Sequence, residues 1–218
     1  MGDPIRSVLI VVAGPNGAGK TTVTKALLQQ FGAVEGFVYV NPDDIAAERF
    51  SHLPVEAANI AAANEAERIR TEAVRDRKNL AFETVLSMPD KVAFVKSAIA
   101  AGYFVRFAFI ATDDPEVNIR RIRARVGNGG HDVPAEKIVA RFNRSIANCA
   151  ELIPLVDRAY VLDNSVDGQI ARKVFRTIGG KLTKVYTEPN ATPEWCGRLA
   201  NGLWGIDLSL GWERRLEG

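Results

Sequence analysis

Short apolar runs recur along the chain, separated by stretches in which apolar residues return every three or four positions. The first run, residues 7–13, is SVLIVVA and is rich in β-branched side chains. A continuous apolar run of this length predicts a strand that is buried on both faces, as in a parallel sheet. Four later runs predict further strands, at residues 37–40, 79–83, 104–110 and 159–162.

The stretches between these runs predict helices. Residues 20–31 have helical periodicity, and the Ala- and Glu-rich stretch from about residue 55 to residue 78 predicts one long helix or two. Further helices are expected over about residues 91–101, after the capping sequence DDPE at residues 113–116, and from about residue 134. Strands that alternate with helices indicate an α/β domain with a mainly parallel, five-stranded sheet.

The last fifty residues follow a different pattern. Residues 172–178 and 181–186 flank a pair of glycines, which is typical of a β-hairpin, and a helix is expected from about residue 193. We therefore predict a core over residues 1–168 and a C-terminal hairpin and helix over residues 169–218. This segment is expected to be an appendage of the core and not a second domain.

Charge and cysteine content narrow the classes of function. The chain has 28 basic and 26 acidic residues, a formal net charge of +2. Nucleic-acid-binding surfaces usually carry a larger and more clustered positive excess, so nucleic acid is not the expected partner. Cys149 and Cys196 lack metal-ligand spacing and suit a reducing compartment. No apolar stretch approaches the roughly 18 residues of a membrane span, so we expect a cytoplasmic protein without membrane contact.

One motif predicts nucleotide binding. The segment GPNGAGKT at residues 14–21 matches G-x-x-x-x-G-K-[ST], directly after a predicted buried strand and directly before a predicted helix. Backbone N–H groups and the helix N-terminus bind phosphate oxygens in this setting. Lys20 is expected to reach the β- and γ-phosphates of ATP, and the Thr21 hydroxyl to ligate Mg²⁺. The residues expected to hold the nucleotide are Gly14, Pro15, Asn16, Gly17, Ala18, Gly19, Lys20, Thr21 and Thr22.

Acidic residues follow two of the predicted strands, at the edge where α/β proteins bind ligands. The sequence Asn41-Pro42-Asp43-Asp44 follows the second strand, and its aspartates could activate an acceptor hydroxyl or cap the next helix. Asp44 is the better candidate for the cap, which leaves Asp43 for chemistry. Glu83 ends the third strand, where its carboxylate either faces the ligand cleft or caps the helix that follows.

Arginines on a predicted helix could bind the same phosphates. Arg121 and Arg125 are four residues apart and therefore share one helix face. Their planar guanidinium groups suit phosphate oxygens, although a salt-bridged surface helix would give the same spacing. The glycine-rich residues 127–131 predict a mobile lid that contains His131, and Arg141 on the next helix could add positive charge to it.

Taken in order, these residues resemble the zeta toxin family of P-loop kinases, in particular its compact branch. The likeness extends over about residues 5–165. Two positions depart from the family pattern, Pro42 and Val85, where a small residue and a threonine are common. The likeness is carried by AGPNGAGKT at residues 13–21, NPDDIA at 41–46, FETVLS at 82–87, GY at 102–103, Arg121, Arg125, GGHDVP at 129–134, Arg141 and DNS at 163–165.

The resemblance implies a three-layer P-loop kinase fold in which the third strand lies beside the P-loop strand. It implies ATP- and Mg²⁺-dependent phosphorylation of the sugar 3′-hydroxyl of UDP-N-acetylglucosamine, with an antitoxin protein as a candidate partner. Asp43 would activate the acceptor, while Lys20, Arg121 and Arg125 would stabilise the migrating phosphoryl group. The implied substrate contacts are Glu83, Thr84, His131 and Arg141.

Two other functions are compatible with a P-loop. A polynucleotide or nucleoside kinase would favour a broad basic groove, against which the near-neutral net charge argues mildly. An NTPase switch or transporter-like ATPase predicts a separate Walker B strand and an ABC signature such as LSGGQ, and the sequence contains no such signature. The favoured interpretation is therefore a small-molecule kinase that acts on a nucleotide sugar.

Overall fold

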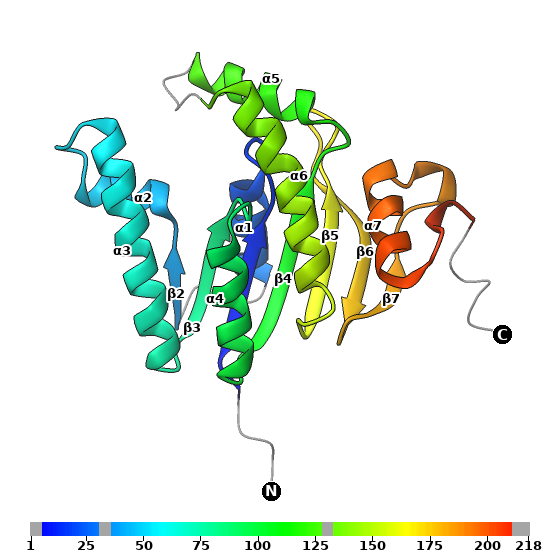
Figure 1. Cartoon of the computed structure of the whole chain (residues 1–218), viewed down its shortest axis with the longest axis horizontal. Helices are drawn as coiled ribbons and strands as arrows, with labels where there is room; N and C mark the ends of the chain where they lie inside the picture. The colour runs from blue at the N-terminus through cyan, green and yellow to red at the C-terminus, as the bar shows by residue number, and fades with distance from the viewer. Residues whose placement is uncertain (1–5, 31–35, 128–132, 211–218) are drawn as a thin grey trace, which may run out of the picture.

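The computed structural model describes residues 6–30, 36–127 and 133–210. They form a seven-stranded sheet with the order β2-β3-β1-β4-β5-β6-β7 (Figure 1). Five strands run parallel, and the third strand lies beside the strand that leads into the P-loop, as the resemblance implied, with the fourth strand on its other side. These strands are β1 (Val8–Ala13), β2 (Phe37–Val40), β3 (Asn79–Thr84), β4 (Phe104–Ala111) and β5 (Arg158–Asp163).

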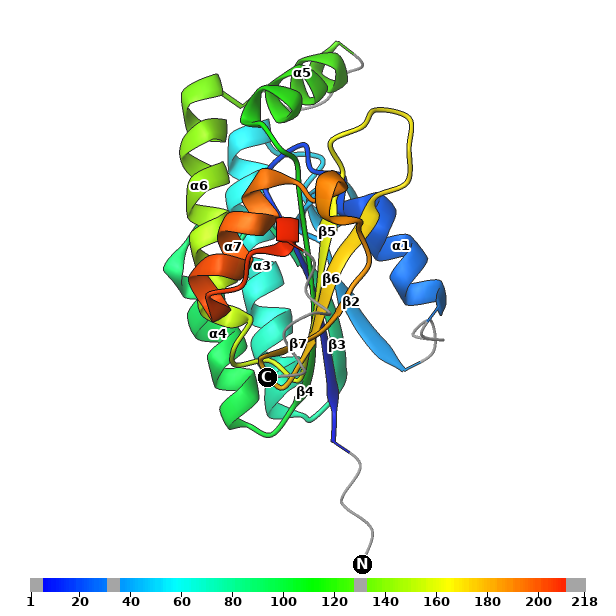
Figure 2. The same ribbon diagram turned by 90° about the vertical axis from the view of Figure 1, so that its right-hand side faces the viewer.

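Helices cover both faces of the sheet, which gives three layers (Figure 2). On one face lies α1 (Lys20–Gln30). On the other lie α3 (Val55–Arg75), α4 (Pro89–Ala100), α6 (Ala135–Leu152) and α7 (Glu194–Trp204). The stretch predicted as one helix or two is the single helix α3, and the predicted three-layer α/β fold is confirmed.

The remaining helices lie at the carboxyl ends of the parallel strands. There, α2 (Pro42–Arg49) follows β2 directly, and α5 (Pro115–Val126) lies beyond the end of β4 (Figure 1). Two 3₁₀-helices, Pro189–Ala191 and Leu208–Leu210, flank α7. Among the described residues, no helix combines the length and the apolar character that crossing a membrane requires.

The unbroken apolar sequence of β1 is explained by burial on both faces. Leu9 and Val11 belong to the larger core cluster, on the side of α3, α4 and α6, while Ile10 and Val12 pack with Val23 of α1. All four β1 side chains are at most 2% exposed. Burial of aliphatic side chains of this size stabilises a fold by about 1.5–3 kcal/mol each, so β1 is held firmly from both sides.

The predicted C-terminal hairpin and helix are present, and the two hairpin strands extend the predicted five-stranded sheet to seven strands. The strand β6 (Arg172–Ile178) pairs antiparallel with β5, and β7 (Lys181–Val185) pairs antiparallel with β6. The helix α7 packs its aromatic side chains edge-on against the sheet. The Trp195 and Phe109 ring centroids are 5.9 Å apart, and those of Trp204 and Phe175 are 5.7 Å apart.

Candidate active site

The P-loop fits tightly between its neighbours. A Cβ atom at Gly14 would lie 1.9 Å from the backbone oxygen of Ile110 in β4, so a side chain at this position is excluded. At Gly17 the backbone has φ +78°, and a Cβ would lie 2.9 Å from the backbone oxygen of Asn118 in α5. Glycine is therefore required at both positions, and the turn leads directly into the N-terminus of α1, a favourable place for an anion.

Lys20 folds back onto this loop and is placed among charges. Its Nζ donates to the backbone oxygens of Gly14 and Pro15, both at 3.0 Å. Loss of hydration lowers the pKa of Lys20 to about 8, the nearby carboxylates of Glu83 and Asp43 oppose this lowering, and Arg125 adds to it. The structure thus brings three other predicted site residues, Glu83, Asp43 and Arg125, within electrostatic range of Lys20.

Glu83 connects the P-loop helix with the edge strand β2. The side chain leaves β3 opposite Val12 of β1. Its Oε2 accepts a hydrogen bond from the Thr21 hydroxyl at 3.1 Å, and its Oε1 accepts one from the Tyr39 hydroxyl at 2.9 Å. The sequence analysis did not identify Tyr39. One feature of the sequence could have indicated it: Tyr39 stands near the carboxyl end of a predicted strand, where its hydroxyl can form a hydrogen bond with a neighbouring site residue.

The oxygens of Thr21 and Glu83 fit a hard cation such as Mg²⁺. Mg²⁺ prefers oxygen ligands and usually takes only one or two from the protein, with phosphates and waters completing its shell. Within the described residues, histidine, cysteine and acidic side chains form no group of three that could hold a metal. The donor set therefore suits a metal that binds together with nucleotide phosphates.

Asp43 and Asp44 both lie in the first turn of α2, and the predicted helix cap was wrong. The N-cap is Asn41, whose side-chain oxygen accepts from the Asp43 N–H at 3.0 Å. Asn41 leaves β2 in an extended conformation, so it precedes the first helical residue, while Asp44 is already inside the helix. Both aspartates are exposed, and Asp43 is the one whose charge acts on Lys20.

The segment after β3 is held in an unusual conformation. The Thr84 hydroxyl accepts from the Leu86 N–H at 3.0 Å, and Leu86 has φ +57° although it carries a branched side chain and is 1% exposed. The helix α6 fixes this turn, because Ser145 donates to the Val85 oxygen and Asn148 donates to the Leu86 oxygen at 2.8 Å. Thr84, predicted to contact substrate, thus forms part of a rigid turn beside Glu83.

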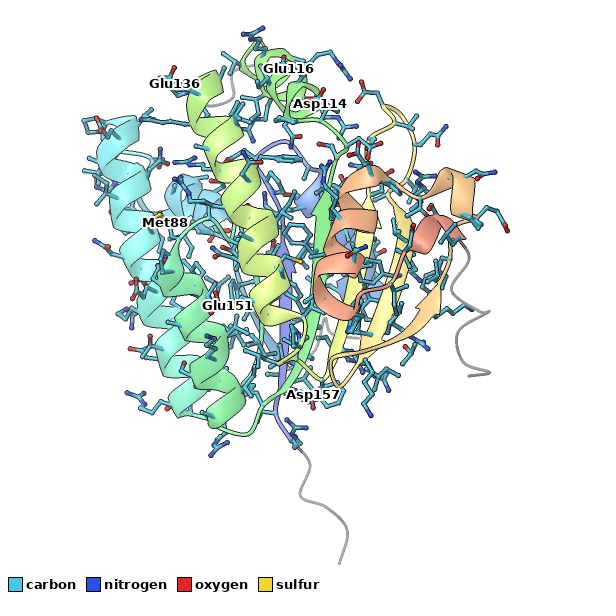
Figure 3. The ribbon with its side chains drawn as sticks, turned by 45° about the vertical axis from the view of Figure 1, so that its right-hand side comes forward. Met88, Asp114, Glu116, Glu136, Glu151 and Asp157 are labelled. Atoms are coloured by element: carbon cyan, nitrogen blue, oxygen red, sulfur yellow. The ribbon has the colours of Figure 1, made fainter. Side chains whose placement is uncertain are left out.

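The helix α5 presents the predicted arginines above the P-loop. Its N-cap is Asp114, which accepts from the Glu116 N–H at 2.8 Å (Figure 3). Arg121 donates through Nε to Asp167 at 2.7 Å and through Nη1 to the backbone oxygen of Gly17 at 3.4 Å. Sequence reasoning missed Asp167, which also accepts from Arg120 at 2.7 Å, because it lies 46 residues from Arg121 along the chain.

Arg141 also reaches the P-loop. Its Nη1 donates to Asn16 Oδ1 at 3.4 Å from the first half of α6. His131 and the predicted lid glycines Gly129 and Gly130 lie outside the described residues. Of the predicted substrate contacts, Glu83, Thr84 and Arg141 therefore lie around the P-loop in the structure.

A hollow is also present elsewhere on the surface. It has a volume of about 590 Å³ and lies over α7 and the segment that follows it, lined by residues that include Glu194, Arg198 and Asp207. No residue of the P-loop lines it. This hollow is therefore separate from the candidate phosphate site, which is formed by the P-loop and the charged side chains around it.

Comparison with known proteins agrees with this geometry. A sequence model of the zeta toxin family matches residues 2–167 of the chain. An uncharacterized protein of Haemophilus influenzae is 31% identical over 130 residues, which correspond to 60% of this chain and 88% of that protein.

Two solved structures share the fold. A chain from the PezAT chromosomal toxin-antitoxin system of Streptococcus pneumoniae matches with a TM-score of 0.61 at 20% identity, over 99% of this chain and 88% of that chain. A chain of the AvrRxo1-ORF1:AvrRxo1-ORF2 complex with sulphate ions gives 0.63 at 16% identity over 82% of this chain, and the match spans only 60% of that chain. The same AvrRxo1 complex is also known with ATP, where the TM-score is 0.62.

The structural likeness by itself shows a shared fold. The family model extends over more than three quarters of the chain, from before β1 to beyond β5, and includes the P-loop and all the residues described around it. The chain belongs to the zeta toxin family of P-loop phosphotransferases.

Proposed function

We propose that this protein is an ATP- and Mg²⁺-dependent kinase of a small molecule, and that its acceptor is the 3′-hydroxyl of UDP-N-acetylglucosamine. The observation that carries the proposal is the convergence of Lys20, Thr21, Glu83 and Asp43 at one edge of the sheet. A phosphate-binding loop next to two carboxylates can serve both the nucleotide and a hydroxyl acceptor. The ATP complex of the AvrRxo1 proteins supports ATP as the donor.

The nucleotide phosphates would be bound by the P-loop backbone and by Lys20. Lys20 must exchange the carbonyl oxygens of Gly14 and Pro15 for the β- and γ-phosphates, which are stronger partners because they are charged. Thr21 and Glu83 are the residues that would hold Mg²⁺. Mg²⁺, when bound, neutralises charge on the phosphates during transfer.

In the proposed reaction, Asp43 acts on the acceptor. In the proposed step its carboxylate takes the proton of the acceptor hydroxyl while the acceptor oxygen bonds to the γ-phosphorus. The bond between the γ-phosphorus and the β–γ bridging oxygen breaks, and ADP leaves. Arg121, oriented over the P-loop, and Arg125, within range of Lys20, would stabilise the charge that develops on the phosphoryl oxygens.

The acceptor assignment comes from the family resemblance. Thr84, whose backbone oxygen accepts from the Gly14 N–H, and Arg141, which donates to Asn16, are the acceptor contacts that we retain, with His131 as a further one. One oxygen of the Glu83 carboxylate accepts a hydrogen bond from Tyr39 and the other accepts one from Thr21. This supports a role for Glu83 in holding the metal, whereas the resemblance implies a role in holding the substrate.

An antitoxin partner and a cytoplasmic location are part of the same proposal. The pneumococcal relative comes from a toxin-antitoxin system. Cys149 and Cys196 are both buried free thiols, which suit a reducing compartment.

The acceptor can be identified by mass spectrometry. The protein is incubated with ATP and Mg²⁺ and, in separate reactions, with nucleotide sugars, nucleotides and oligonucleotides with free 5′-ends. We expect UDP-N-acetylglucosamine to gain the mass of one phosphoryl group. Phosphorylation of an oligonucleotide or another metabolite in its place would overturn the acceptor and leave the kinase assignment intact.

Asp43→Asn should abolish phosphoryl transfer but leave ATP affinity within a few-fold of wild type. The amide keeps the shape of the side chain and cannot accept a proton, a loss that typically costs about 10²–10⁴-fold in rate. Asp44→Asn is the matched control on the same helical turn, and it should lose only the modest favourable interaction with the helix N-terminus. Steady-state kinetics and ATP titrations of both variants check this, and equal losses of activity would show that the wrong aspartate was chosen.

ATP affinity should depend on whether the Lys20 amine is protonated. Because the pKa of Lys20 in the free protein is about 8, the side chain is charged below this pH and loses its charge above it. The triphosphate favours the charged amine, so ATP binding should weaken as pH rises above 8 and should then take up close to one proton. Calorimetry at about pH 9, in two buffers with different ionisation enthalpies, measures this uptake. Lys20→Met should show none, and equal uptake in that variant would assign the proton to another group.

A further inference from the structure

A continuous chain of hydrogen bonds connects the N-terminus of α2 with the N-terminus of α1. The Asp43 N–H donates to Asn41 Oδ1 at 3.0 Å, and Asn41 Nδ2 donates to the Tyr39 hydroxyl at 3.4 Å. Tyr39 donates in turn to Glu83 Oε1 at 2.9 Å, and Thr21 donates to Glu83 Oε2 at 3.1 Å. This chain of hydrogen bonds therefore begins at Asp43, the residue predicted to activate the acceptor, and ends at Thr21, the predicted metal ligand, with Tyr39 at its centre.

The direction of the central hydrogen bond is fixed by chemistry. An ionised carboxylate can only accept, so the Tyr39 hydroxyl is the donor to Glu83. A tyrosine hydroxyl ordinarily keeps its proton near neutral pH, so it is available as this donor. A hydrogen bond to a charged group is stronger than one between neutral groups, which favours a fixed arrangement.

Packing alone does not account for the position of Tyr39. Its side chain is 38% exposed on the edge strand β2, and it extends toward Glu83 on the neighbouring strand β3. The terminal torsion of a glutamate side chain is soft, so a carboxylate held through one oxygen can turn about its last bond. With both oxygens held, Glu83 keeps one oxygen on Thr21.

We infer that Tyr39 is a positioning residue: it holds the Glu83 carboxylate next to Thr21, so that the two oxygen ligands proposed for Mg²⁺ are already in place before the metal binds. The inference rests on the proposed function, in which Thr21 and Glu83 hold the metal. Through Asn41, the same hydroxyl is joined to the turn that carries Asp43. Tyr39 itself need not touch ATP or the acceptor for this role.

Tyr39→Phe removes the hydroxyl and keeps the ring, so it tests this role directly. ATP affinity is measured by calorimetry with and without Mg²⁺, on full-length protein and without any acceptor. Loss of a hydrogen bond to a charged group corresponds to about a tenfold change, so the improvement in ATP affinity on adding Mg²⁺ should shrink about tenfold. ATP affinity without Mg²⁺ should change less than about twofold, because the P-loop contacts are untouched.

Tyr160→Phe provides the matched control. Tyr160 is a partly buried tyrosine on β5, and within the described part of the chain its hydroxyl has no hydrogen-bond partner. This variant should keep the full effect of Mg²⁺ on ATP affinity. An equal loss in both variants would mean that the effect comes from general loosening of the fold, and it would overturn the inference.

A double-mutant cycle with Glu83→Gln separates positioning from independent effects. If Tyr39 acts through Glu83, then Tyr39→Phe should change the Mg²⁺ effect less than about twofold once Glu83 is replaced. Additive losses would overturn the inference. A Tyr39→Phe variant that keeps the full Mg²⁺ effect would do so as well, while the kinase proposal would stand. Failure to phosphorylate any nucleotide sugar would leave this binding result unaffected, so the two failures are distinguishable.

Discussion

The close packing of Gly14 between two strands determines where the other site residues can lie. Its backbone N–H donates to the Thr84 oxygen at the end of β3 at 3.2 Å, and its Cα faces the Ile110 oxygen of β4, where no side chain fits. The P-loop is therefore fixed to both neighbours of β1. Because parallel strands end at the same edge of a sheet, the residues that follow β2, β3 and β4 face the phosphate site without long connecting loops.

The same arrangement sets the electrostatics of the site. A lysine that has lost part of its hydration lies near two carboxylates and an arginine, and its pKa is lowered to about 8. Such a lysine gains more from a triphosphate than a fully hydrated lysine does, because part of its desolvation has already taken place on folding. Opposite charges lie on different sides of Lys20. The carboxylates of Glu83 and Asp43 lie toward β2 and β3, and the arginines of α5 lie above the P-loop.

The sequence was sufficient for those features that depend on neighbours along the chain. The apolar run of β1 and the cap of α5 are local patterns, and the structure confirms them. The glycines of the P-loop are also a local pattern, and at Gly14 and Gly17 the backbone packs too closely for a side chain. The cap of α2 was misassigned because Asn41 and Asp44 are both good capping residues, and only the extended backbone at Asn41 distinguishes them. Tyr39 and Asp167 could not be found in this way, since their partners Glu83 and Arg121 come from distant segments that only the sheet order brings together.

The account depends most on the P-loop as the site of phosphoryl transfer, and the variant Lys20→Ala tests that claim most directly. Turnover of ATP and thermal unfolding should be measured on the same preparation. Turnover should fall at least about 100-fold, because a charge-assisted contact to the migrating phosphoryl group is lost. The unfolding temperature should stay the same or rise, because the loop backbone needs no lysine and a poorly hydrated charge is removed. A folded variant that keeps more than about a tenth of wild-type turnover would contradict the account.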